Sequence, residues 1–298
     1  MITCYNRINR ITDQRMRTLA CFLLIVGTLH ASPQALERAE SLYQQTDYPA
    51  SLRVLDSDPA PDATTYELIG KNYFMLGNYD KAVQFFEKAV ANAPAVSDYQ
   101  LWLGRAYGRR AETAGLLLAP SRASKARQCL ETAIALDPKN AEAMNDLFDY
   151  YLNAPGFLGG GTEKAEAIAQ RIEHERPAEY HHELSQLADH RKQYSDALAH
   201  LRKAVELAPH ELGRVLDLAR YLAKLGRMEE SDAYFAQAQK HWPNEPALAF
   251  VQAKTYVDHH REPDRSRQLL EQYLKSTVTP DDPPKQAAEK LLRQIASR

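Results

Sequence analysis

The stretch Tyr66–Pro94, YELIGKNYFMLGNYDKAVQFFEKAVANAP, decides the fold of this 298-residue chain. One face of a first predicted helix is formed by four residues at helical spacing, Tyr66, Ile69, Gly70 and Tyr73. Gly77-Asn78 breaks that helix, and Pro94 ends a second one. The face of the second helix is formed by Ala82, Phe86 and Ala89. Small residues therefore stand where two helices cross closely, and large residues fill the space beside them.

The same alternation recurs along the chain. The position of Gly70 is repeated, with steps of 34, 44, 37, 34 and 34 residues, at Gly104, Phe148, Ser185, Ala219 and Ala253. Closing prolines follow at Pro94, Pro138, Pro177, Pro209 and Pro243. This pattern resembles the tetratricopeptide repeat family, in the type found in secreted or periplasmic bacterial proteins. The resemblance implies an all-α fold, a right-handed α-solenoid of antiparallel helix pairs, which is a binding surface rather than a catalyst.

The predicted array covers residues 32–279. Six full repeats are expected at 62–95, 96–139, 140–177, 178–210, 212–244 and 246–278. A degenerate repeat at 33–60 precedes them, because the end of a stack buries only one side. Residues 280–298 follow a break at Pro280-Asp281-Asp282-Pro283-Pro284 and form a predicted C-terminal capping helix.

Two insertions account for the irregular repeat lengths, one at 108–122 and one at 154–161. The first contains Leu116-Leu117-Leu118, which is too apolar for a free loop. We therefore expect the preceding helix to run past Arg110 and the leucines to fold back onto Phe157 and Leu158 of the second insertion. Because both insertions fall at the same turn of consecutive repeats, they should form one ridge beside the groove.

The N-terminal segment 1–31 has the composition of a secretory signal peptide. Its basic residues are Arg7, Arg10, Arg15 and Arg17. The uncharged run Leu19–Leu29 follows them, and as a helix it would extend only about 16 Å, too short to cross a bilayer. Small residues at Ala31-Ser32 predict cleavage after Ala31, export to the periplasm or beyond, and no stable membrane span afterwards. The alternative is a buried first helix, and translation could begin at Met1 or Met16.

Composition narrows the functional class. The net charge of −2 lacks the basic footprint of a general nucleic-acid binder, so we expect no nucleic-acid partner. Of three cysteines, only Cys129 lies beyond the predicted leader, which leaves no intramolecular disulfide. No set of nucleophile, base and stabilising group is evident, so the sequence does not favour an enzyme, and no cofactor is expected.

The family geometry places the first helix of each pair on the concave side. On this chain the resulting candidate ligand-binding residues are Lys71, Phe74, Trp102, Arg105, Arg109, Asp146, Asp149, His182 and Glu183. They predict an aromatic, basic mouth followed by an acidic middle, with Trp102 as the best anchor because Trp and Arg are frequent hot-spot residues. The alternative is that Trp102 only packs between helices. The Lys and Asn clamp of chaperone-binding members is absent.

These residues favour a non-catalytic scaffold that binds a protein or peptide in the cell envelope. The alternative is a solute- or metal-binding accessory protein of a transport system. A metal site could be assembled from His182, Glu183, Asp189 and His190, but its two histidines are more than two helical turns apart. We therefore predict no metal site. The sequence specifies neither the partner's identity nor the oligomeric state.

Overall fold

The computed structural model describes residues 33–113, 115 and 118–297, and this part of the chain contains only helices and their connections. The predicted leader and its cleavage site lie outside the described residues. The first eight elements are α1 (Pro33–Gln44), α2 (Tyr48–Leu55), α3 (Ala63–Met75), α4 (Tyr79–Asn92), α5 (Ser97–Glu112), α6 (Ala119–Leu136), α7 (Ala141–Asn153) and the 3-10 helix η1 (Gly156–Leu158). The others are α8 (Thr162–Ile172), α9 (Pro177–His190), α10 (Tyr194–Leu207), α11 (Leu212–Lys224), α12 (Met228–His241), α13 (Pro246–Asp258), α14 (Pro263–Lys275) and α15 (Lys285–Ala296).

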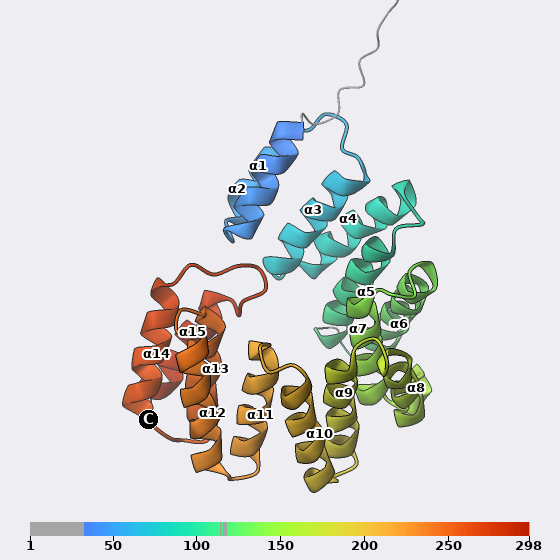
Figure 1. The fold of residues 1–298 in the computed structure, drawn as a ribbon. Helices are drawn as coiled ribbons and strands as arrows, with labels where there is room; N and C mark the ends of the chain where they lie inside the picture. Colours follow the sequence, from blue (N-terminus) through green and yellow to red (C-terminus); the bar gives the residue numbers. More distant parts are fainter. Residues whose placement is uncertain (1–32, 114, 116–117, 298) are drawn as a thin grey trace, which may run out of the picture.

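The helices form antiparallel pairs that follow one another in an arc (Figure 1). The arc runs from α1 and α2 through α5–α9 and turns back, so that α14 and α15 lie below α1 and α2 (Figure 1). The first helices of successive pairs contact one another: α3 contacts α5, α5 contacts α7 and α7 contacts α9. The all-α solenoid expected from the sequence is therefore the observed fold.

Small residues allow the close helix crossings. A Cβ atom added to Gly70 would lie 2.6 Å from a ring carbon of Phe86, and one added to Gly104 would lie 3.1 Å from Leu130. The second helix of each pair carries a fully buried small residue at one equivalent position. These residues are Ser51, Ala82, Ala126, Ala165, Ala197, Ser231 and Ser266. The alternation of small and large residues in the sequence thus sets how closely the pairs pack.

Most of the described turns between the two helices of a pair contain a residue with positive φ. That residue is glycine in two turns, Gly77 (φ 73°) and Gly226 (φ 76°). In other turns a residue with a side chain takes the same conformation, as Thr46 (φ 61°) and Lys192 (φ 60°) do. Such a conformation is strained for any residue with a Cβ atom, above all for a β-branched one.

The ends of the array are built differently from its middle. At the N-terminus, α2 is only 8 residues long. At the C-terminus, α15 packs on α13 and α14 through buried Ala288 and the partly buried Leu291 and Ile295. The last helix pair is therefore covered by a single amphipathic helix.

The structure corrects the prediction for the first insertion. As expected, α5 continues past Arg110, to Glu112. Leu118, however, is 56% exposed and Phe157 is 81% exposed, so these two side chains do not bury each other. Leu116 and Leu117 lie outside the described residues. The reason is that α6 begins already at Ala119, which places most of the insertion in longer helices instead of a folded-back loop.

Candidate functional site

A groove of about 1020 Å³ lies on the inner side of the N-terminal half. One wall is made by Phe74 and Trp102, from α3 and α5. Residues of both insertions also line the groove, among them Pro120, Pro155 and Phe157. The two insertions therefore lie along the same groove, as the sequence predicted, although Leu118 and Phe157 do not bury each other. Because most lining side chains are apolar or aromatic, we call this the apolar groove.

Trp102 is held in place by its neighbours. Its ring stacks on Phe86 with 6.0 Å between ring centroids and meets the edge of Phe74 at 5.5 Å. Two cations approach the same ring, Lys71 Nζ at 5.1 Å and Arg105 Cζ at 5.0 Å from its centroid. These contacts favour a fixed ring orientation. Trp102 thus packs against the core and lines the apolar groove at the same time, which combines the two alternatives for this residue.

The cations of the predicted basic mouth have partners within the protein. Arg105 donates from Nε to Asp146 at 2.5 Å and pairs with Glu142 at 2.9 Å, which joins α5 to α7. Arg109 pairs with Glu112 at 2.5 Å and donates to the Tyr79 hydroxyl. Lys71 pairs with Glu67 at 2.7 Å. The mouth is therefore less positive than the sequence suggested.

Asp149 stands where the apolar groove ends and a second groove begins. Its side chain lines both. Burial, with a smaller contribution from the neighbouring Asp146 carboxylate, raises the pKa of Asp149 to about 6. The predicted acidic middle is therefore present, but one of its two aspartates binds a proton more readily than an exposed aspartate.

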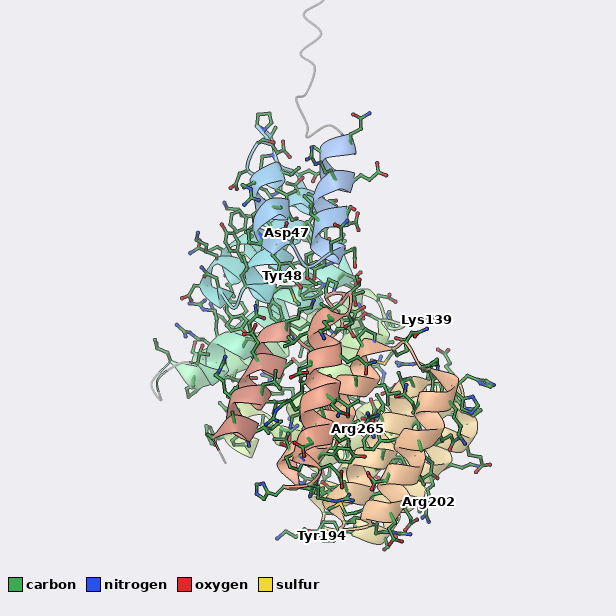
Figure 2. The ribbon with its side chains drawn as sticks, turned by 90° about the vertical axis from the view of Figure 1, so that its left-hand side faces the viewer. Asp47, Tyr48, Lys139, Tyr194, Arg202 and Arg265 are labelled. Carbon is green, nitrogen blue, oxygen red and sulfur yellow. The ribbon has the colours of Figure 1, made fainter. Side chains whose placement is uncertain are left out.

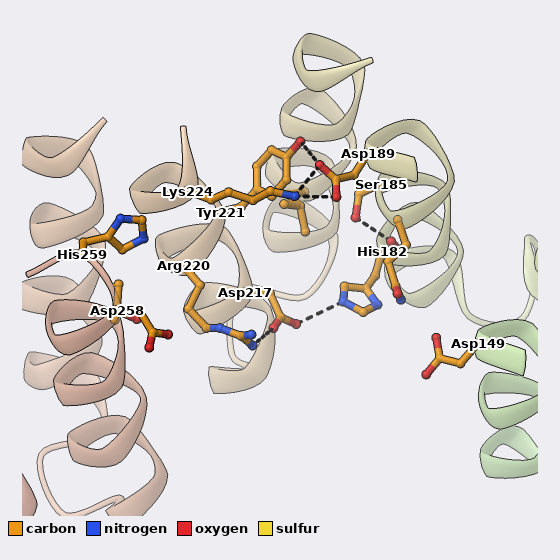
Figure 3. A pocket seen from close by; sticks show the side chains of 13 residues that line it. Asp149, His182, Ser185, Asp189, Asp217, Arg220, Tyr221, Lys224, Asp258 and His259 are labelled. Atoms are coloured by element: carbon orange, nitrogen blue, oxygen red, sulfur yellow. Dashed lines mark hydrogen bonds and ion pairs between the residues drawn. The ribbon is translucent and has the colours of Figure 1, made fainter. Parts of the chain in front are cut away.

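The second groove, of about 550 Å³, is polar and is lined by α9, α11 and α13 (Figure 3). His182 bridges two carboxylates, with Nε2 3.2 Å from Asp217 and Nδ1 3.6 Å from Glu179. Burial alone would lower the pKa of His182, but the neighbouring Asp217 and Glu179 carboxylates outweigh it and raise the value to about 9. His182 is therefore a charged link between α9 and α11 and not a free groove side chain.

Other ion pairs close the same region. Asp189 accepts hydrogen bonds from Lys224 at 2.6 Å and from the Tyr221 hydroxyl at 3.0 Å (Figure 3). Glu179 accepts from Arg176 and Arg214. Most charges of the polar groove are thus committed to linking neighbouring helices.

Glu183 is the clearest departure from the predicted site. Its side chain is 1% exposed, so it does not reach the groove surface where the sequence placed it. Neither carboxylate oxygen has a hydrogen-bond partner among the described residues. Burial, reinforced by the nearby Glu179 charge, raises the pKa of Glu183 to about 8, so this carboxyl is protonated at neutral pH. The helical position was correct, but its accessibility was not.

The described residues offer no metal centre, since no group of three or more His, Cys, Asp or Glu side chains is arranged to hold an ion. Cys129 does not have the character of a nucleophile. Burial raises the pKa of its thiol to about 11, which keeps it protonated. The metal-binding alternative therefore has no site in this part of the chain.

The apolar groove contains a wall that sequence reasoning missed. Pro280, Asp282 and Pro284, from the connection between α14 and α15, line it together with Phe74 and Trp102. In the sequence these residues only mark a break in the repeat. Their arrival at the opposite end of the array depends on the curvature of the whole arc, which no local pattern reports.

Comparison with known families gives two matches to the tetratricopeptide repeat, at residues 63–96 and 190–255. No curated protein matches the chain. Among the described residues, no helix combines the length and the apolar character needed to cross a membrane.

Two solved structures are similar in fold. The tetratricopeptide repeat protein TTC0263 of Thermus thermophilus is 24% identical, with 63% of this chain and 97% of that chain covered and a TM-score of 0.52. A tetratricopeptide repeat protein from Parabacteroides merdae is 14% identical, with 88% and 98% covered and a TM-score of 0.56. At these identities the likeness concerns the fold alone.

Proposed function

We propose that this chain, which belongs to the tetratricopeptide repeat family and is a repeat scaffold for protein interactions, holds a protein or peptide partner in its apolar groove. The observation that carries the proposal is the groove itself. Consecutive repeats and both insertions contribute to one surface lined by Phe74, Trp102 and Phe157. A few residues supply most of the binding energy in protein interfaces, and Trp is enriched among them.

The groove explains why an apolar segment would be bound. Phe157 is largely exposed, so binding a partner there removes a large apolar surface from water. The cations beside Trp102 have internal partners, so they contribute orientation more than net charge. The arrangement therefore suits an apolar or mixed peptide better than a strongly acidic one.

The proposed location is the periplasm or the exterior of the cell. It is supported by the sequence of residues 1–31, where arginines precede a short apolar run and small residues surround Ala31. N-terminal sequencing of the exported protein should begin at Ser32. A full-length product in the cytoplasm would contradict this part of the proposal.

Affinity capture tests the binding surface directly. Tagged mature protein is used to capture partners from its native envelope, and the same capture is repeated with Phe74→Ala and with Arg109→Glu. Both variants should lose the partner, because both residues line the apolar groove. The matched control is Arg202→Glu on α10, which is as exposed as Arg109 (47% against 49%) and does not line either groove (Figure 2).

The outcomes separate clearly. Partner loss with the two groove variants, and retention with Arg202→Glu, supports the proposal. Equal capture by all four proteins would place the interaction surface elsewhere on the molecule.

A further inference from the structure

The ionisable side chains that line the apolar groove carry a formal net charge of −2, from two cations and four anions. They are Arg105, Arg109, Glu112, Asp146, Asp149 and Asp282. Each arginine is paired with a carboxylate of this set, Asp146 or Glu112. Asp149 and Asp282 form no ion pair within the described part of the chain. The charge that the protein leaves unpaired in the apolar groove is therefore negative.

Asp149 is the unpaired carboxylate with the most central place. It lines both grooves and is exposed to solvent. Its side chain projects from α7 toward α9, and no hydrogen bond or ion pair joins it to the other residues of the polar groove (Figure 3). The neighbouring cation, His182, is already paired with Asp217 and Glu179. The carboxylate of Asp149 is thus accessible to a ligand.

The surroundings of Asp149 favour pairing with a cation from outside. The neighbouring helices restrict its hydration, and the Asp146 carboxylate adds a second negative charge; both effects raise the pKa of Asp149 to about 6. The group is still mainly ionised at pH 7. An ionised carboxylate with reduced hydration and no partner costs free energy, and a bound cation would offset this cost.

Apolar surface lies in the same groove as Asp149. Tyr150 and Asn153 follow it on α7 and also line the apolar groove. The Tyr150 hydroxyl donates to the carbonyl oxygen of Leu158 at 2.9 Å, which attaches the second insertion to α7. Leu158 and the largely exposed Phe157 belong to the same lining. A ligand at Asp149 therefore meets both a charge and an apolar surface.

Lysine and arginine are the side chains that match both features. Their methylene stems pack along apolar surface while the terminal charge reaches a carboxylate. An acidic side chain at this place would add to the negative charge of the groove, and a neutral polar one would leave Asp149 without a counter-charge. Large apolar residues beside the basic one would cover the aromatic wall of Phe74 and Trp102.

Arg109 stabilises the wall of the groove. It donates to the Tyr79 hydroxyl at 3.3 Å, and the Tyr79 ring meets the Phe74 ring with 5.4 Å between centroids. Arg109→Glu removes this support and places a second carboxylate beside Glu112. The partner loss expected for that variant follows from a disturbed aromatic wall and does not require an acidic partner.

We propose that the apolar groove binds a segment in which a lysine or arginine stands next to large apolar residues. The basic side chain pairs with Asp149, and the apolar ones pack against Phe74 and Trp102. This inference rests on the proposed function, because it names the chemical class of the partner for the same groove. Charge complementarity carries it, since the protein pairs its own arginines in the groove and leaves Asp149 unpaired.

The first test identifies the peptides that the groove accepts. A phage-displayed library of random peptides is selected on the immobilised full chain and, in parallel, on Phe74→Ala and on Asp149→Asn. Peptides that are enriched on the parent and lost on Phe74→Ala occupy the groove. They should contain Lys or Arg beside aromatic or aliphatic residues. The enrichment of basic residues should disappear on Asp149→Asn, which keeps the size of the side chain and removes its charge.

A double-mutant cycle then measures the contact itself. The most enriched peptide is synthesised with its basic residue and with methionine in that place, and calorimetric titration of the full chain gives Kd. Asp149→Asn should weaken binding of the basic peptide about tenfold. The methionine peptide should bind the parent and Asp149→Asn equally, because the interaction is already removed. Asp149→Glu, which keeps the charge, should bind the basic peptide within about threefold of the parent.

The matched control is Asp196→Asn, at an exposed aspartate on α10 that lines neither groove, and it should leave Kd unchanged. Circular dichroism confirms that each variant is folded. Groove peptides without basic residues, or equal Kd values for the parent and Asp149→Asn, would overturn the proposed ligand class. A library that yields no peptide dependent on Phe74 would overturn it as well.

Capture of the native partner separates this inference from the proposed function. If the partner is lost from Phe74→Ala but retained in full by Asp149→Asn, the groove remains the binding surface and the basic anchor is wrong. If Phe74→Ala retains the partner, the proposed function itself fails. Loss from both variants, with retention by Asp196→Asn, supports both.

Discussion

Trp102 and Glu183 occupy the same place in two different repeats, two residues before the small residues Gly104 and Ser185. At the N-terminal one, a ring is packed between Phe74 and Phe86 and lines the apolar groove. At the C-terminal one, a carboxyl group is buried without a hydrogen-bond partner among the described residues. One repeat position therefore stabilises one half of the arc and costs stability in the other.

The difference follows from what surrounds each position. Trp102 gains apolar contacts, which are roughly independent of pH. Around Glu183 its own helix contributes Glu179 and His182 and α7 contributes Asp149, so its state depends on protonation. We therefore expect the N-terminal half to respond to changes in packing and the C-terminal half to changes in pH.

The largest expected effect is a loss of stability when the packed ring of Trp102 is removed. Trp102→Ala should lower the free energy of unfolding by about 3 kcal/mol, because it removes the stacked ring and leaves a cavity beside Phe86. Trp102→Phe should lose less than half of that. Urea unfolding followed by circular dichroism measures both. If Trp102→Ala lowers the free energy of unfolding by less than about 1 kcal/mol, the ring contributes to the groove surface and not to the stability of the fold.

The next prediction concerns Glu183, where a substitution should increase the free energy of unfolding instead of lowering it. Its pKa is about 8 in the folded protein, whereas an unperturbed glutamate side chain has a pKa of 4.5. Between these two values the folded state keeps a proton that the unfolded state has released, so stability falls as pH rises from about 4.5 to 8. Glu183→Gln removes this loss and should raise the free energy of unfolding by about 2 kcal/mol at pH 8.

The pH series gives this prediction its control. The advantage of Glu183→Gln should shrink to near zero at pH 4.5, where the carboxyl is protonated in the folded state and half-protonated in the unfolded state. Glu206→Gln, at an exposed position on α10, should show no comparable trend. A constant advantage at every pH would rule out protonation as the cause.

A smaller effect should be the same in both halves. Thr46→Gly and Lys192→Gly each relieve a positive φ in the turn of a helix pair, one at the N-terminus and one in the middle. Each should raise the free energy of unfolding by about 0.5–1 kcal/mol, as the strain is partly offset by the greater freedom of glycine in the unfolded chain. Thermal unfolding measures the shift. If one substitution stabilises the protein and the other destabilises it, the effect of the turn residue depends on the repeat that contains it.

The smallest expected effect is confined to acid pH. His181 and His200 face each other with 3.0 Å between their Nδ1 atoms, and burial lowers the pKa of both. Their contribution to stability is complete above pH 6.5 and is lost as pH falls below that value. His200→Gln should therefore flatten the decrease in Tm between pH 6.5 and 5. The raised pKa of His182 acts in a separate window, because its contribution is lost only as pH rises toward 9.

The sequence by itself determined the repeat, the helix pairs and the packing positions. Gly70, Ala82 and Phe86 could be assigned because helical spacing places neighbours three and four residues apart on one face, whatever the rest of the chain does. The family geometry implied by the resemblance placed Trp102 and Arg105 on the inner face. It could not tell which charges would be paired, because Arg105 meets Asp146 only across two helices.

Only the tertiary structure determined which individual side chains are paired or buried. It also determined that the arc brings residues from the two ends of the array to one groove. Glu179 and Glu183 are one helical turn apart, yet the first accepts hydrogen bonds from two arginines and the second has none among the described residues. Pro280 reaches the groove of Phe74 because small rotations between successive repeats add up along the whole array. Burial and long-range contact depend on that sum, and a periodic sequence specifies each repeat but not the sum.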